Sequence, residues 1–199
     1  MRATSIFIIL SAGALSAADR MNISVCNFGE ASQKALTNAE TEVSAFFRAA
    51  KVDIVWKNCD DLPGAAPANV RWFVLRVRDI KPLSLTVTSA SLDVLGRAFV
   101  APDGEGDIAD AYFEAVEGLA GQYRADAGTL LGYVIVHELG HLLLGPGHGA
   151  NGVNIMRAKW SPDELRALKQ RWLRFTKPQE AAIHLALKTN RAASGQQPN

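Results

Sequence analysis

The stretch HELGHLLLGPGH, residues 137–148, places three histidines and one glutamate within twelve residues. It lies inside a long apolar run that follows Asp126, a residue type that caps helix N-termini. The run ends at Gly145, because the following proline cannot continue a helix. We therefore predict one long apolar helix between these two residues, with a polar cluster near its C-terminal end.

On such a helix, His137 and His141 lie one turn apart on the same face, where two imidazoles can bind one metal ion. Glu138 points beside them, toward a water held by that ion, which is the arrangement of a general base in metal-assisted hydrolysis. Burying these three polar side chains without a hydrogen-bond or metal partner would cost on the order of several kcal/mol. The pattern therefore predicts a catalytic Zn²⁺ site and amide hydrolysis; a purely structural role is the alternative.

A catalytic zinc site takes a third protein ligand and leaves one position open. His148 is favoured, because a Gly-Pro-Gly turn can swing the chain back beneath the metal. Glu164 and Asp163 are the alternatives on a later helix, although a capping box with Ser161 already explains Glu164. His184 lies much further along the chain and is interpreted as a surface or packing histidine.

These motifs resemble those of the metzincin clan of zinc peptidases: H-E-x-x-H, a helix-ending glycine, a third histidine and a downstream methionine turn. In this chain Gly145 and His148 follow His141 by four and seven residues, one more than in the clan. The resemblance covers residues 137–156 and implies that Met156 packs below the metal without binding it. The long leucine-rich motif is also similar to that of a group of uncharacterised exported bacterial proteins.

The chain departs from the clan at a second position. Many members carry a tyrosine two residues after the methionine, whereas this chain has Ala158. An oxyanion stabiliser from that position is therefore absent. Tyr112 and Tyr133 are the tyrosines that could substitute for it.

The remaining pattern predicts an α/β (α+β) fold: a twisted mixed sheet with a crossover helix, the long active-site helix and a C-terminal helix, as the metzincin resemblance also implies. Alternating, β-favouring segments indicate strands at 20–28, 52–59, 70–80, 91–102 and 107–116, and helical spacing indicates helices at 30–52 and 161–175. The acidic turn 102–107 is expected to be solvated, with calcium binding as the alternative. Either 96–101 or 110–116 is expected to be the edge strand that pairs with an extended peptide.

The first 18 residues read as a signal peptide, with cleavage after Ala17 or Ala18, and a buried N-terminal element is the alternative. Residues 19–176 are predicted to form one zinc-metallopeptidase-like domain, and 177–199 a partly disordered C-terminal extension. Export to a secreted or periplasmic location favours a disulfide between Cys26 and Cys59, with two buried thiols as the alternative.

The chain has 199 residues and a net charge of +1, so nothing in its charge indicates nucleic-acid binding. We expect a monomer without an integral membrane segment after processing, acting on a peptide or protein substrate. The predicted function is an exported zinc peptidase. A zinc amidase on a small or cell-wall substrate and a non-catalytic, zinc-stabilised binding protein are the alternatives.

Overall fold

The structure is a computed structural model that describes residues 19–61, 70–79, 95–148, 154–170 and 172–193. The predicted signal peptide lies outside these residues. The described strands form one five-stranded sheet in the order β2-β1-β3-β5-β4. Their bounds are β1 Asp19–Asn27, β2 Val52–Asn58, β3 Arg71–Arg78, β4 Gly96–Phe99 and β5 Ile108–Tyr112. The predicted mixed sheet is confirmed.

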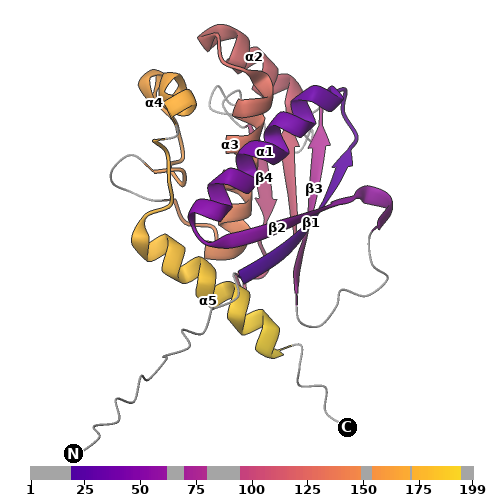
Figure 1. Ribbon diagram of the computed structural model, residues 1–199, viewed down its shortest axis with the longest axis vertical. Coiled ribbons are helices and arrows are strands. Elements are labelled where there is room, and N and C mark those ends of the chain that lie inside the picture. Colours follow the sequence, from indigo (N-terminus) through magenta and orange to yellow (C-terminus); the bar gives the residue numbers. More distant parts are fainter. Residues whose placement is uncertain (1–18, 62–69, 80–94, 149–153, 171, 194–199) are drawn as a thin grey trace, which may run out of the picture.

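Four of the strands run parallel, and β4 alone pairs antiparallel, with β5. Helix α1 (Gln33–Ala49) makes the predicted crossover from β1 to β2 (Figure 1). Strand β4 is the edge next to β5, and it contains most of the predicted edge segment 96–101. The alternative edge segment 110–116 is wrong, because β5 lies between β3 and β4.

The predicted strand 107–116 is also wrong in its second half. Strand β5 ends at Tyr112, and helix α2 (Phe113–Tyr123) follows directly. The reason is the spacing of the buried residues Phe113, Val116 and Ala120, which lie on one face of a helix. The aromatic and β-branched residues at the start of α2 favour a strand locally, but burial of its apolar face against the core favours the helix.

Helix α3 (Ala127–Leu144) is the predicted long helix, with Asp126 as N-cap and Gly145 as C-cap. It is long and apolar enough to cross a membrane, yet 83% of it is buried inside the fold, as in a core helix. It packs against α1, where Gly128 and Gly132 lie close to the α1 backbone. A Cβ at Gly132 would lie 3.0 Å from the Ala39 carbonyl oxygen, so glycine permits this close approach.

The predicted helix 161–175 is shorter than expected. Helix α4 (Pro162–Ala167) starts with the predicted capping box and ends in the 3-10 turn η3 (Leu168–Gln170). The chain then leaves helical geometry, and Leu173 and Phe175 enter the core. Phe175 packs against the rings of Phe46 and Phe47, with centroids 5.2 and 5.6 Å away.

Helix α5 (Lys177–Ala193) packs below the sheet through Ile183 and Leu187 (Figure 1). His184, predicted to be a surface or packing residue, is paired: its Nδ1 lies 2.7 Å from Asp19 Oδ2 at the start of β1. The division into a domain 19–176 and an extension 177–199 stays a prediction.

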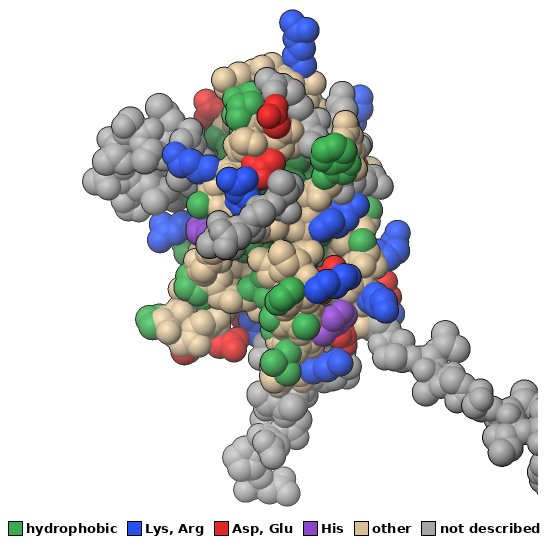
Figure 2. Space-filling model, turned by 90° about the vertical axis from the view of Figure 1, so that its left-hand side faces the viewer, with side chains coloured by type: hydrophobic (Ala, Val, Ile, Leu, Met, Phe, Trp, Pro, Cys, Tyr) green, Lys and Arg blue, Asp and Glu red, His purple; other side chains and the backbone are tan. Residues whose placement is uncertain are grey.

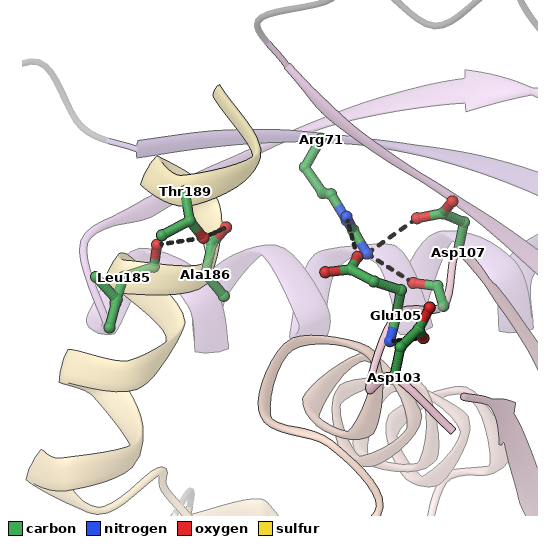
Figure 3. A network of polar contacts seen from close by, with 8 residues as sticks. Arg71, Asp103, Glu105, Asp107, Leu185, Ala186 and Thr189 are labelled. Atoms are coloured by element: carbon green, nitrogen blue, oxygen red, sulfur yellow. Dashed lines mark hydrogen bonds and ion pairs between the residues drawn. The ribbon is translucent and has the colours of Figure 1, made fainter. Parts of the chain in front are cut away.

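The acidic turn 102–107 faces an arginine (Figure 3). Arg71 on β3 lies 3.0 Å from both a Glu105 and an Asp107 carboxylate oxygen, and it donates to the Gly106 carbonyl at 2.9 Å. The guanidinium supplies the positive charge that a calcium ion would bring. On the face that Figure 2 shows, Lys and Arg side chains are spread with acidic and apolar side chains between them.

The predicted disulfide between Cys26 and Cys59 is present and ties β1 to the short turn η1 (Cys59–Asp61) after β2. We expect Cys59→Ser to lower the free energy of unfolding by about 3–4 kcal/mol, because the loop closed by the bridge would gain entropy in the unfolded chain. Urea unfolding of the oxidised protein and the variant measures this. The double variant Cys26→Ser/Cys59→Ser is the control and should lose a similar amount; equal stability of all three would contradict the prediction.

Candidate metal centre

Three histidine side chains converge at the C-terminal half of α3. His137 and His141 come from the helix, and His148 from the segment after it. The His141 Nε2 lies 3.1 Å from the His137 Nε2 and 3.2 Å from the His148 Nε2. Gly145, with φ at 89°, lets the chain leave the helix and return beneath it. The sequence-favoured third ligand therefore lies beside the other two.

This spacing suits a tetrahedral zinc ion. Zinc binds imidazole nitrogens at about 2.0–2.1 Å, so two ligand nitrogens at the tetrahedral angle lie about 3.3 Å apart. The separations from His141 to His137 and His148, 3.1 and 3.2 Å, are close to this value, and all three nitrogens lie within 4.8 Å of one another. Three nitrogens also match the softness that zinc prefers.

The hydrogen bonds of the Nδ1 atoms determine which ring nitrogen of each helical histidine carries the proton. The His137 Nδ1 lies 2.8 Å from the Ile155 carbonyl oxygen, and the His141 Nδ1 lies 3.1 Å from the Gly145 carbonyl oxygen. A carbonyl only accepts, so each Nδ1 carries the proton and donates it. In the neutral rings both Nε2 atoms then present lone pairs toward the same point. A cation there would relieve the repulsion between the two lone pairs. Histidines that bind a metal usually donate their other ring N–H to a carbonyl or carboxylate in this way.

The pKa values of the two helical imidazoles also favour metal binding. Burial lowers the pKa of His137 to about 4, and the neighbouring His141 and His148 add to the decrease, against the hydrogen bond to Ile155. Burial also lowers the pKa of His141. Both imidazoles are therefore neutral near pH 7, which is the form that binds metal.

Glu138 is buried between α3 and the edge strand β4. A Cβ at Gly96 would lie 2.8 Å from both Cγ and Oε1 of Glu138, so only glycine leaves room for the carboxylate. Burial raises the pKa of Glu138 to about 8, the charge of Asp110 adds to the increase, and a hydrogen bond from the Ala98 backbone N–H opposes it. A carboxyl group with a pKa near neutrality is suited to accept and return a proton.

This raised pKa predicts how the stability of the metal-free protein depends on pH. Between the ordinary value of 4.5 and about 8, the folded protein keeps a proton that the unfolded chain has released, so stability falls as pH rises. Glu138→Gln has no such proton. In the presence of a chelator, its stability relative to the native protein should rise by up to about 1.4 kcal/mol per pH unit in this window. Urea unfolding at several pH values measures this, and a difference that does not change with pH would contradict it.

Met156 lies directly under the metal-binding turn of α3. It is 1% exposed, and its sulfur packs against Gly140, between the two helical histidines. The Asn154 side-chain oxygen accepts the Met156 backbone N–H at 2.9 Å and so holds the turn. Met156 thus packs against the helical turn that carries His137 and His141, and its role beneath a bound metal stays a prediction.

Gly140→Ala tests this packing. The added methyl group would overlap the Met156 sulfur and lie 3.3 Å from the Phe175 ring. We expect a loss of about 1–3 kcal/mol in the free energy of unfolding, typical of an overpacked core, together with weaker zinc binding. Gly121→Ala on α2, where a Cβ has open space, is the control and should be neutral or stabilising. Thermal unfolding and zinc titration measure both; equal behaviour of the two variants would contradict the packing argument.

The alternative ligands have other roles. Glu164 accepts from Arg157 Nη1 at 2.6 Å and from the Ser161 backbone N–H at 2.6 Å, so both carboxylate oxygens are occupied. Asp163 is exposed on α4. Among the described residues, the grouping of possible metal ligands consists of the three histidines alone.

A cleft of about 830 Å³ opens over the histidines and Glu138. Strand β4 forms one side, with Gly96 and Ala98 lining the cleft. The segment that follows Met156 forms another side, through Arg157 to Trp160. The centre is therefore accessible from solvent beside β4, the edge strand among the described strands.

Neither tyrosine considered as an oxyanion stabiliser lines this cleft. The Tyr133 hydroxyl donates to the Leu168 carbonyl at 3.0 Å, and its ring packs against Phe46 of α1. The Tyr112 hydroxyl is buried and has no hydrogen-bond partner among the described residues. Neither phenol therefore belongs to the lining of the cleft.

Sequence reasoning missed two supports of the site. Trp160 stacks edge-on against His137, with centroids 5.9 Å apart, and its Nε1 lies 3.4 Å from the Ile155 carbonyl oxygen that also accepts from His137. Helix α2, whose first four residues were predicted to belong to the strand 107–116, forms a further side of the cleft. A backbone carbonyl has no sequence signal, and the local strand preference at the start of α2 outweighs the helical spacing of Phe113, Val116 and Ala120.

No protein-family model and no curated protein matches the chain. Among solved structures, the archaemetzincin from Methanopyrus kandleri is similar with a TM-score of 0.52 and 17% identity, covering 87% of this chain and 99% of that one. Metalloproteinase-II from Bacteroides fragilis aligns with a TM-score of 0.49 and 14% identity, covering 88% of this chain and 55% of that one. The first likeness shows a fold shared with an archaemetzincin.

Proposed function

We propose that this protein is an exported, zinc-dependent peptidase. The observation that carries the proposal is the convergence of the Nε2 atoms of His137, His141 and His148, beside the buried Glu138, at the base of an open cleft. The fold shared with archaemetzincin supports the same class of chemistry. The three histidines would hold the zinc ion, and Met156 would support them from below.

Zinc held by three neutral imidazoles would polarise a substrate carbonyl and lower the pKa of a bound water toward about 7. Glu138 would accept a proton from the attacking water and pass it to the leaving amine. Its burial against Gly96 restricts the carboxylate to one region of the cleft. The Ile155 and Gly145 carbonyls would keep both helical imidazoles in the metal-binding tautomer.

An extended peptide is the substrate that the cleft favours. Strand β4 borders it and, among the described strands, pairs only with β5, so a substrate could add to the other edge of β4 by backbone hydrogen bonds. This supports a peptidase over an amidase for a small molecule. The buried base Glu138 argues against a purely structural zinc site, which has no use for it.

Export, a monomeric state and the lack of nucleic-acid partners remain part of the proposal. The disulfide supports an extracytoplasmic location. We propose cleavage after Ala17 or Ala18. The intact mass of protein recovered from outside the cytoplasm tests this, and a mass that retains the first 18 residues would contradict it.

Digestion of a mixed peptide library by the zinc-loaded protein tests the activity. Mass spectrometry should detect new termini that disappear with a chelator and return with added zinc. A library left intact by protein with one zinc per chain would contradict the peptidase proposal and leave the metal site standing.

A further inference from the structure

Helix α2 has two distinct faces. Phe113, Val116 and Ala120 are buried against the core. The opposite side of the helix lines the cleft through Ala115, Gly118, Leu119, Gln122 and Tyr123. The helix is therefore anchored on one side and free to contact a bound substrate on the other.

Apolar side chains from two other helices line the same cleft. Val134 lies on α3, one turn before His137, and Leu165 lies on α4; both line the same cleft. Leu119 and Tyr123 are partly exposed to this space. Apart from Gln122, the side chains of α2 that line the cleft are apolar, as are Val134 and Leu165. The cleft thus has an apolar recess beside the metal ligands.

Gly118 leaves part of this recess open. It lines the cleft, and a Cβ built on it meets nothing within 4 Å. Gly121, one turn along α2, has the same open surroundings but does not line the cleft. Glycine lowers helix stability relative to alanine at either position, so local helix formation gives no reason for it.

We propose that α2 is the specificity wall of the cleft, and that Gly118 admits a bulky apolar side chain of the substrate next to the bond that is cleaved. The inference rests on the proposed peptidase function. Apolar lining favours leucine-like or aromatic side chains over alanine by about tenfold or more, through the area removed from water.

Binding of three hydroxamic acids, with alanine, leucine or phenylalanine side chains, to the zinc-loaded protein tests the recess without relying on turnover. Calorimetric titration gives the dissociation constants for the native protein, Gly118→Phe and the matched control Gly121→Phe. We expect the native protein and the control to prefer the leucine and phenylalanine probes by about tenfold or more over alanine. Gly118→Phe should lose this preference and keep its affinity for the alanine probe. Both variants should keep the native melting temperature, because both positions have open space.

Two outcomes would overturn the inference while leaving the peptidase proposal intact. One is binding without side-chain preference in the native protein. The other is the same response of the two phenylalanine variants. Failure of all three probes to bind zinc-loaded native protein would contradict an accessible catalytic metal, and so the proposed function itself. The new termini in the library digestion give a second readout, since Gly118→Phe should shift them toward small side chains.

Discussion

Glu138→Gln is expected to bind zinc as the native protein does and to hydrolyse peptides about 10²–10⁴-fold more slowly, the usual contribution of a general acid–base group. Glutamine has nearly the same shape and fits against Gly96, but it cannot accept a proton from water. Because the three histidines alone hold the metal in this account, the substitution leaves the ligand set unchanged. Initial rates on a cleaved library peptide, with zinc content measured on the same samples, test this.

Glu117→Gln on α2 is the matched control, because Glu117 is exposed and does not line the cleft. Its rate should equal that of the native protein. Full activity in Glu138→Gln would show that the base lies elsewhere. Loss of zinc from Glu138→Gln would instead make this carboxylate a ligand.

The elements with local signals could be predicted from the sequence. The long helix begins and ends at Asp126 and Gly145 as expected, because a side-chain cap and a glycine–proline stop act within a few residues. The capping box of Ser161 and Glu164 is another local signal, and it explained Glu164 without a metal. The helical spacing in 30–52 is a third local signal, because the apolar positions that carry it are the buried residues of α1: Ala35, Leu36, Ala39, Val43, Phe46 and Phe47.

Features that depend on tertiary contacts could not be predicted. Local strand preference concealed α2, since only packing against the core shows which face of Phe113–Tyr123 is buried. The local pattern predicts a helix that continues to residue 175, but Leu173 and Phe175 are buried in the core outside helical geometry. Neither the Ile155 carbonyl behind His137 nor the fit of Glu138 against Gly96 has a signal in the sequence, because both join segments far apart in the chain.

The longer ligand loop has a physical explanation in the structure. The extra residue, relative to the metzincin spacing, lies between His141 and Gly145, in the last turn of α3, which runs to Leu144 and is capped by Gly145. Gly145 then adopts a positive φ, and its carbonyl oxygen lies 3.1 Å from the His141 Nδ1. His148 then reaches the same point as the helical histidines. The identity of the third ligand is the part of the site that the sequence left open among His148, Glu164 and Asp163.

Zinc content of the protein comprising residues 19–199 therefore tests the central claim most directly, measured beside His148→Ala and Glu164→Ala. We predict one zinc per chain in the native protein and in Glu164→Ala. His148→Ala should lose more affinity than the 10–100-fold typical of a lost outer-shell partner, because it removes a direct ligand. Since Glu164 caps α4, melting curves show whether a variant is folded before its zinc is counted. Zinc retained by folded His148→Ala and lost from folded Glu164→Ala would contradict the three-histidine site and assign the third ligand to the glutamate.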